Sequence, residues 1–216
     1  MNVLRLQVRL DAVTVRIAEA EHNAVVRRVA TTDSTRIAGR EARAGDLWQA
    51  VLDAVAEAGA GAGAGAADPL EAIELDDTGA SLAMWDLETL GAPTPLLGAE
   101  AGFGAAVGAI AAHDPQAWAL VADDRHGLGT LGSYVLARMT RGTWHAVSPA
   151  AALQTGLSTP GLSAAPPEGR VRWDAAACAQ ADVPIEALPV ILGDWSGVVT
   201  DPRTLPGLRV PVRPAG

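Results

Sequence analysis

Two adjacent carboxylates, Asp76 and Asp77, are the residues of this chain whose types best suit acid–base or metal chemistry. They follow residues 71–75, which we expect to be a short strand, and ligand sites of α/β folds often lie at the ends of such strands. Consecutive side chains of a strand point to opposite faces, so the two carboxylates are poorly placed to share one metal ion or one proton. A solvated turn is therefore the preferred interpretation of this pair.

The stretch 127–132, GLGTLG, matches the G-x-G-x-x-G pattern of dinucleotide-binding turns. Backbone amides at the start of a helix could hold a phosphate there. The pattern also requires an acidic residue about 20 positions further on to bind the ribose, and residues 144–155 contain none. We expect a tight helix entry at this stretch rather than a nucleotide site.

The remaining candidates for chemistry are single side chains. Cys178 lies in an alanine-rich segment without a basic neighbour, so a buried, unreactive thiol is expected. His145 is expected to be a packing residue, and His113 and His126 are expected to be exposed in loops. The serine of 193–197, GDWSG, stands one position too late for a nucleophile elbow. No catalytic centre follows from motifs alone.

The amino-acid composition excludes several classes of function. The 216 residues carry a net charge of −9, and all 16 basic residues are arginine. Without lysine the chain cannot use a P-loop lysine, a Schiff base or a Ser-Lys pair. An acidic chain is unsuited to nucleic acid, and no apolar run approaches the ~20 residues of a membrane span. We expect neither nucleic acid nor membrane as a partner. The single cysteine excludes an internal disulfide and indicates the reducing cytoplasm, and we expect no secretion signal.

Hydrophobic periodicity divides the chain into strands followed by helices. Alternating apolar residues predict three consecutive antiparallel strands, and apolar residues at helical spacing after Asp46 predict a helix capped by that residue. The Ala/Gly run at 58–68 and the Pro/Ser/Gly-rich segment at 158–169 are predicted to be a flexible loop and a surface loop. These elements favour one α/β or α+β domain over residues 1–216. The predicted strands are 4–10, 13–17, 25–29, 71–75 and 81–85, and the later helices are 103–112, 128–139 and 175–181.

Residues 129–157, GTLGSYVLARMTRGTWHAVSPAAALQTGL, resemble the FGGY family of carbohydrate kinases, most closely its glycerol kinase branch. The shared features are a Gly-Thr helix entry, an apolar helix ending in Met-Thr-x-Gly, and a following His. Trp-Asp at 85–86, Trp-Asp at 173–174 and Leu-Pro at 188–189 extend the likeness. The resemblance implies an actin-like ATPase, ribonuclease H-like α/β domain with a mixed sheet and flanking helices, specifically the N-terminal lobe.

The family's functional residues do not carry over. In the family, the turn between the first two strands binds phosphate, and this chain has residues 9–13 there. Arg9 stands at the first position of that turn and Asp11 replaces its glycine, which opposes phosphate binding. The family's polyol-contact segment becomes 78–80, Thr-Gly-Ala, and its catalytic aspartate has no counterpart. No catalytic or metal residue is therefore assigned. The candidate substrate contacts of this degenerate cleft are Asp76, Asp77, Thr78, Ser81, Glu100 and Ser148.

These substitutions favour a catalytically inactive pseudokinase lobe that acts as a binding or interaction module, with a protein, a second copy, or a sugar or polyol as its partner. No cofactor is expected. The alternative is the sugar-binding half of a split carbohydrate kinase, in which case a partner chain supplies the ATP lobe and ATP and magnesium are used. Sugar sensing without catalysis is a variant of the first hypothesis, and a truncated copy that merely folds is its rival.

Overall fold

The computed structural model describes residues 2–9, 13–19, 25–32, 43–61, 70–77, 81–98, 102–161, 171–205 and 207–215. In chain order the elements are β1 (Asn2–Val8), β2 (Val13–Glu19), β3 (Val25–Thr32), α1 (Ala44–Gly61), β4 (Leu70–Asp77), β5 (Ser81–Asp86), β6 (Leu97–Gly98), α2 (Phe103–His113), α3 (Pro115–Ala122), β7 (His126–Thr130), α4 (Leu131–Met139), β8 (Ala146–Val147), α5 (Pro149–Gln154), β9 (Ser158–Pro160), β10 (Val171–Trp173), α6 (Ala175–Gln180), the 3₁₀ helix η2 (Ile185–Ala187), β11 (Val190–Ile191) and β12 (Val212–Pro214).

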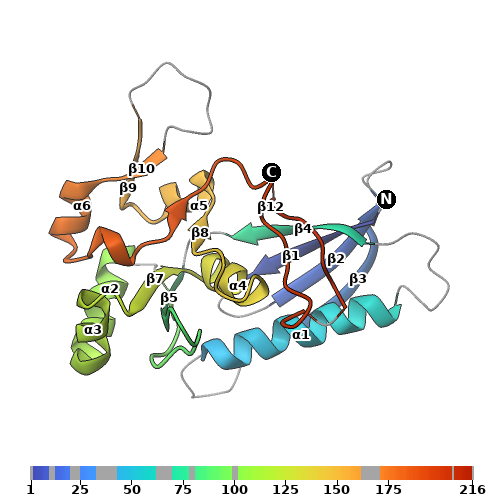
Figure 1. Ribbon diagram of the computed structural model, residues 1–216, viewed down its shortest axis with the longest axis horizontal. Coiled ribbons are helices and arrows are strands. Elements are labelled where there is room, and N and C mark those ends of the chain that lie inside the picture. The colour runs from blue at the N-terminus through green and yellow to red at the C-terminus, as the bar shows by residue number, and fades with distance from the viewer. Residues whose placement is uncertain are drawn as a thin grey trace.

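A mixed five-stranded sheet forms one side of the molecule, with the strand order β12-β4-β1-β2-β3 (Figure 1). β1, β2 and β3 are an antiparallel meander, as predicted, while β4 runs parallel to β1 and β12 runs parallel to β4. The alternation in β1 determines its orientation: Leu4, Leu6 and Val8 are buried, whereas Arg5 and Arg9 are exposed. The α/β class with a mixed sheet and flanking helices is confirmed.

Helix α1 covers the apolar face of this sheet (Figure 1). Leu47, Val51 and Ala54 are completely buried and pack into the same core as the apolar residues of β1 and β4. The helix begins at Ala44, so Asp46 lies in its first turn and is not the capping residue that was predicted. There its negative charge interacts favourably with the positive end of the helix dipole. It also continues through Gly61, so the loop predicted at 58–68 was wrong for 58–61, where alanine favours helix. Residues 62–69 lie outside the described part.

Strand β5 separates two hydrophobic cores, and its alternate side chains belong to different ones. Ala83 and Trp85 pack into the core under the large sheet, whereas Leu82 and Met84 pack into a second core with α2 and α3. This double burial explains why four consecutive apolar residues form a strand here. Helix α4 lies between the sheet and β5, and every one of its residues except Arg138 is buried.

The structure differs from the predicted elements at three places. The helix predicted from 128 begins at Leu131, because 126–130 form strand β7 antiparallel to β5. Helix α3 follows α2 directly and was not predicted; Pro115 occupies its first position and Asp114 caps it. Residues 158–160 of the predicted surface loop are strand β9, which pairs with β10, and 162–170 lie outside the described part. No described helix is long and apolar enough to cross a membrane.

Candidate functional site

The candidate site lies at the carboxyl ends of the parallel strands β1 and β4, the edge at which open α/β sheets bind ligands. The two carboxylates predicted to be a solvated turn are instead the last two residues of β4, and both are partly buried. That prediction was wrong because β4 extends two residues further, pairing Asp76 with Gln7 and Asp77 with Val8. Their opposite orientation is as predicted, since they contact different neighbours.

Asp77 faces helix α4 and is held by the residues at its start. The hydroxyl group of Thr130 donates a hydrogen bond to Oδ2 of Asp77. The same hydroxyl caps α4 by accepting a hydrogen bond from the backbone N–H of Ser133 at 3.1 Å, and the Ser133 hydroxyl donates to the Thr130 carbonyl at 2.8 Å. Both Thr130 and Ser133 are buried. The Asp77 carboxylate is therefore attached to a rigid part of the core.

Gly132 makes this arrangement possible. A Cβ at position 132 would lie well inside 3.0 Å of the Asp77 carboxyl group, so only glycine leaves room for it. The carboxylate thus fills the space over the second residue of α4. The first four residues of the GLGTLG stretch accordingly belong to β7 and its last two begin α4, where its last glycine accommodates Asp77. This geometry agrees with the tight helix entry predicted there.

Asp76 points to the other face of the sheet and accepts a 2.7 Å hydrogen bond from Nε2 of Gln7. Arg9, predicted as a remnant of the phosphate turn, is exposed just beyond β1. Because Asp76 and Asp77 lie on opposite faces, they do not converge on one ion. Among the described residues, no group of three or more His, Cys, Asp and Glu side chains is placed to bind a metal ion.

The other predicted contacts are only partly described. Ser81 begins β5 and is paired with Gly98 of β6. Ser148 caps α5 by accepting a hydrogen bond from the backbone N–H of Ala151 at 3.2 Å. Thr78, Glu100 and Asp11 lie outside the described residues. Ser148 therefore has a local capping role. Asp76 and Asp77 are close to each other only as neighbours in the sequence of β4.

A buried aromatic cluster lies between β5, β7 and α4. The Trp85 ring contacts the His145 ring edge-on at 4.9 Å between centroids and the Tyr134 ring at 5.5 Å. Burial lowers the pKa of His145 to about 4, and a hydrogen bond from the imidazole to the backbone carbonyl of Leu128 acts in the opposite direction, so the ring is neutral at pH 7. The packing role predicted for His145 agrees with this position. His126 was predicted to be exposed, but it is buried in β7, with Nε2 3.6 Å from Oδ2 of Asp86.

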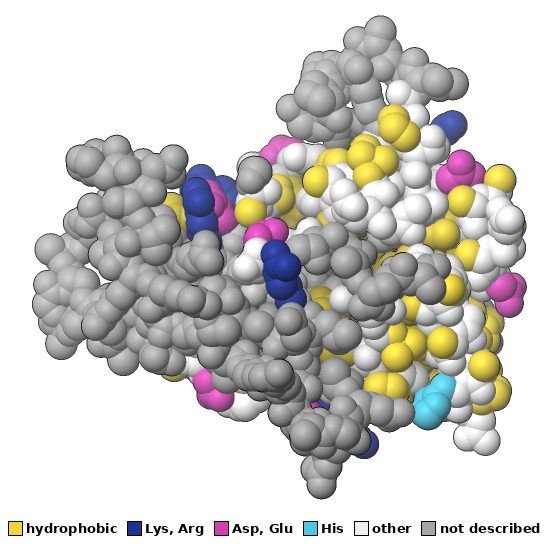
Figure 2. Space-filling model, turned by 180° about the vertical axis from the view of Figure 1, so that it is seen from behind, with side chains coloured by type: hydrophobic (Ala, Val, Ile, Leu, Met, Phe, Trp, Pro, Cys, Tyr) yellow, Lys and Arg dark blue, Asp and Glu magenta, His cyan; other side chains and the backbone are white. Residues whose placement is uncertain are grey.

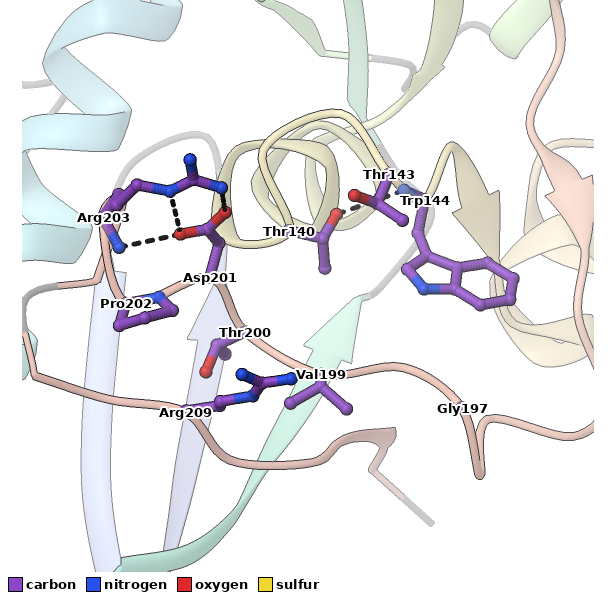
Figure 3. A pocket seen from close by; sticks show the side chains of 10 residues that line it. All are labelled: Thr140, Thr143, Trp144, Gly197, Val199, Thr200, Asp201, Pro202, Arg203 and Arg209. Atoms are coloured by element: carbon purple, nitrogen blue, oxygen red, sulfur yellow. Dashed lines mark hydrogen bonds and ion pairs between the residues drawn. The ribbon is translucent and has the colours of Figure 1, made fainter.

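A pocket of about 430 Å³ opens between the end of α4 and the segment 197–209 (Figure 3). Arg203 binds Asp201 at its mouth, with distances of 3.0 Å from Nε to Oδ1 and 2.6 Å from Nη2 to Oδ2. This side-chain hydrogen bond, supported by the backbone N–H of Arg203, lowers the pKa of Asp201 to about 2. Arg209 is drawn beside Val199 and Thr200 at the pocket wall (Figure 3). None of the predicted site residues lines this pocket. Seven of its lining residues lie in the segment 197–209, and the other three, Thr140, Thr143 and Trp144, lie at the end of α4 in the stretch with the Met-Thr-x-Gly pattern. That pattern did not indicate a pocket, because its partners lie more than 50 positions later in the sequence.

Comparison with known proteins identifies the fold. No protein-family model matches the chain, and no curated protein sequence matches it. Solved structures do match over nearly its whole length. Glycerol kinase from Plasmodium falciparum, solved with ADP, superposes with a TM-score of 0.79 at 12% identity, covering 99% of this chain and 47% of that kinase. Xylulose kinase from Rhodospirillum rubrum gives 0.76 at 15% identity, covering 100% and 49%.

The chain has the fold of an FGGY sugar kinase. Gluconate kinase from Lactobacillus acidophilus, at a TM-score of 0.67 and 12% identity, shares it as well. The chain spans about half the length of these kinases, which is consistent with the N-terminal lobe predicted from residues 129–157. In the sugar-kinase fold, an actin-like α/β architecture, the Asp77–Thr130 contact lies at the junction of β4, β7 and α4.

Proposed function

We propose that this chain is a catalytically inactive lobe with the sugar-kinase fold that acts as a binding or interaction module. The observation that carries the proposal is the state of the two carboxylates at the ligand-binding edge of the sheet. Asp77 accepts a hydrogen bond from Thr130 and fills the space over Gly132, and Asp76 accepts one from Gln7. A general base must reach the substrate hydroxyl from which it removes a proton, whereas these carboxylates are engaged by side chains of the protein.

The sequence supports the same proposal independently. The position of the family's phosphate-turn glycine is Asp11, whose negative charge opposes the binding of a polyphosphate. A lobe that has lost this glycine but retains its apolar framework is suited to binding rather than to phosphate transfer. The proposal includes no resident cofactor.

Titration calorimetry and a phosphate-transfer assay test the proposal together. The purified chain is titrated with Mg-ATP and, separately, with glycerol, xylitol and xylulose, and ADP formation is then measured with each pair. We expect no ADP above the background without protein. Binding heat for a polyol without turnover would support the sugar-sensing form of the proposal. Turnover that disappears in Asp77→Asn would overturn it, because it would make Asp77 a working base.

A second candidate, half of a split carbohydrate kinase, is favoured by one observation: the chain matches only 46–49% of each kinase structure. In this case a separate chain supplies the ATP lobe, and the complex uses ATP and magnesium as its cofactors. The test is purification from the source cells under mild conditions, followed by the same assay. A co-purifying chain of similar size that restores ATP-dependent phosphorylation supports the split kinase. A single-chain preparation without activity contradicts it.

We further propose that the chain works in the reducing cytoplasm, either with a protein partner or as a homo-oligomer. The supporting observation is Cys178, the one cysteine, which is a buried free thiol. Light scattering of the purified chain, with and without a reducing agent, measures the oligomeric state. We expect the same mass under both conditions.

A further inference from the structure

Four helices, α2, α3, α5 and α6, contain no Asp, Glu, Lys or Arg residue, although 19% of all residues of the chain are charged. The exposed side chains of α2 and α6 are alanine and glutamine, with His113 at the end of α2. Helices α2, α3 and α6 lie at the end of the molecule away from the large sheet (Figure 1). In the view from behind, the described side chains at this end are mostly hydrophobic or uncharged (Figure 2). Surface helices ordinarily turn charged residues to water, so this end is suited to contact with protein.

A groove of about 530 Å³ lies in this uncharged region, between the start of α2, the end of α6 and the residues that follow α5. We call it the neutral groove; its lining residues belong to the segments 102–105, 155–157 and 177–182. Among the described residues that line it, only Asp182 is charged, and Asp182 is exposed to solvent, which screens its charge. On one side α2 and the end of α6 are in close contact, because a Cβ at Gly104 would lie 2.8 Å from the Cβ of Ala181.

An exposed leucine lies close to the neutral groove in the sequence. Leu153 is one of three large hydrophobic residues that are exposed in the described part of the chain, and its exposed fraction is 40%. It lies at the end of α5, two positions before Thr155, which lines the groove. Ala151 and Ala152 are buried, so Leu153 projects from the outer side of this helix. The centre of a protein interface typically combines apolar side chains with a depletion of charged residues, and the neutral groove with Leu153 has this composition.

The net charge of −9 indicates which partner needs an uncharged surface. Two copies of an acidic chain repel each other, and like charges placed opposite one another in an interface weaken binding strongly. A different protein could use the acidic charge by presenting basic residues, whereas a second copy requires a surface without charge. In a dimer with two-fold symmetry the same surface meets itself, so a projecting side chain beside a hollow serves both copies at once.

We propose that the neutral groove and Leu153 form the interface between two copies of this chain, with the partner subunit's Leu153 against the groove. The proposal rests on the homo-oligomeric form of the proposed function and names the surface that this form uses. The surface is lined by residues of α2, α5 and α6 and not by Asp76 or Asp77. It therefore does not depend on whether the chain transfers phosphate.

The test is sedimentation velocity of the full chain over a range of concentrations, at low salt and again at higher salt. We expect a dimer with a Kd of about 100 μM or below, which becomes tighter as salt rises because salt screens the repulsion between the acidic copies. Ala105→Glu should raise this Kd at least about tenfold, since each copy then brings a carboxylate into the groove. The matched control is Ala56→Glu, the same change at an exposed alanine of α1, and it should change the Kd less than about twofold.

Thermal unfolding separates loss of the interface from loss of the fold. Ala105→Glu should not lower Tm, because an acidic residue in the first turn of α2 interacts favourably with the helix dipole. If it does lower Tm, Leu153→Ser provides a second comparison without a new charge, and it should raise the Kd about tenfold because each dimer loses two leucine contacts.

The proposal is overturned if the wild type remains monomeric at about 100 μM in both salt conditions. It is also overturned if a dimer forms but Ala105→Glu and Leu153→Ser leave its Kd unchanged, or if Ala56→Glu weakens it as much as they do. These results are independent of the assay for ADP. An inactive monomer would overturn this inference and leave the inactive lobe of the proposed function, whereas an active dimer with the expected variant effects would do the reverse.

Discussion

Gly132→Ala should destabilise the protein through one identifiable contact, the approach of Asp77 to the start of α4. The added Cβ would lie within 3.0 Å of the Asp77 carboxyl group, so the carboxylate must rotate away and lose its hydrogen bond from Thr130. Overpacking costs about 1–3 kcal/mol, and loss of a hydrogen bond to a charged group costs about 1.5–3 kcal/mol. Alanine returns at most about 1 kcal/mol through its helix propensity. We expect a net loss of about 2–5 kcal/mol in the free energy of unfolding.

Urea denaturation of four variants, Gly132→Ala, Gly108→Ala, Asp77→Ala and the Asp77→Ala/Gly132→Ala double variant, measures this cost. Gly108→Ala is the control, because position 108 lies on the exposed side of α2 and a Cβ there meets no atom within 4 Å; it should stabilise by about 0.5–1 kcal/mol. In an Asp77→Ala background the clash is absent, so adding Gly132→Ala should cost less than about 0.5 kcal/mol. The reasoning is refuted if Gly132→Ala leaves stability unchanged, or if its cost is equal in both backgrounds.

Three further predictions follow from the same packing. Burial holds the pKa of His145 near 4, below the ordinary 6.5, so between these pH values the unfolded chain binds a proton at this residue and the folded chain does not. The free energy of unfolding is therefore highest above pH 6.5 and decreases as pH falls towards 4, by up to about 3 kcal/mol. Urea titrations at several pH values should show a smaller decrease for His145→Gln. Thr130→Val should cost about 1–3 kcal/mol in urea, because it removes the cap of α4 and the donor to Asp77, whereas Thr130→Ser should retain most of the stability. Cys178 is buried and burial raises its pKa, so an aromatic disulfide reagent should modify it only on unfolding, and fast modification of the native protein would contradict the structure.

Much of the fold could be predicted from local patterns. The alternation in β1 and the helical spacing after Asp46 each report which side of an element meets the core, and that information is local. Strand β7 could not be predicted in this way, because Leu128 and its neighbours are buried on both faces and their pattern resembles a helix. The tight packing of Trp85 and His145 against Gly127 and Gly129 decides in favour of the strand.

The candidate site was predictable in position but not in contacts. The residue types located Asp76 and Asp77 at the end of β4, and the period of two along a strand predicted their divergence. No feature of the sequence near Asp77 indicates that Thr130, 53 positions later, donates a hydrogen bond to it, or that Gly132 leaves space for its carboxylate. The interpretation as a solvated turn failed because the partners that bury a strand end lie far away in the sequence.

The pairing of β12 with β4 has a consequence for how the chain folds. The two strands are separated by about 140 residues, with Val212 beside Ile73. Contacts between distant segments form slowly, since the intervening loop must be closed before any hydrogen bond compensates for its entropy. On the ribosome, β4 therefore emerges long before its neighbour and presents an open parallel edge, the kind of surface that recruits other strands. This edge is the point at which a nascent chain would aggregate or require a chaperone.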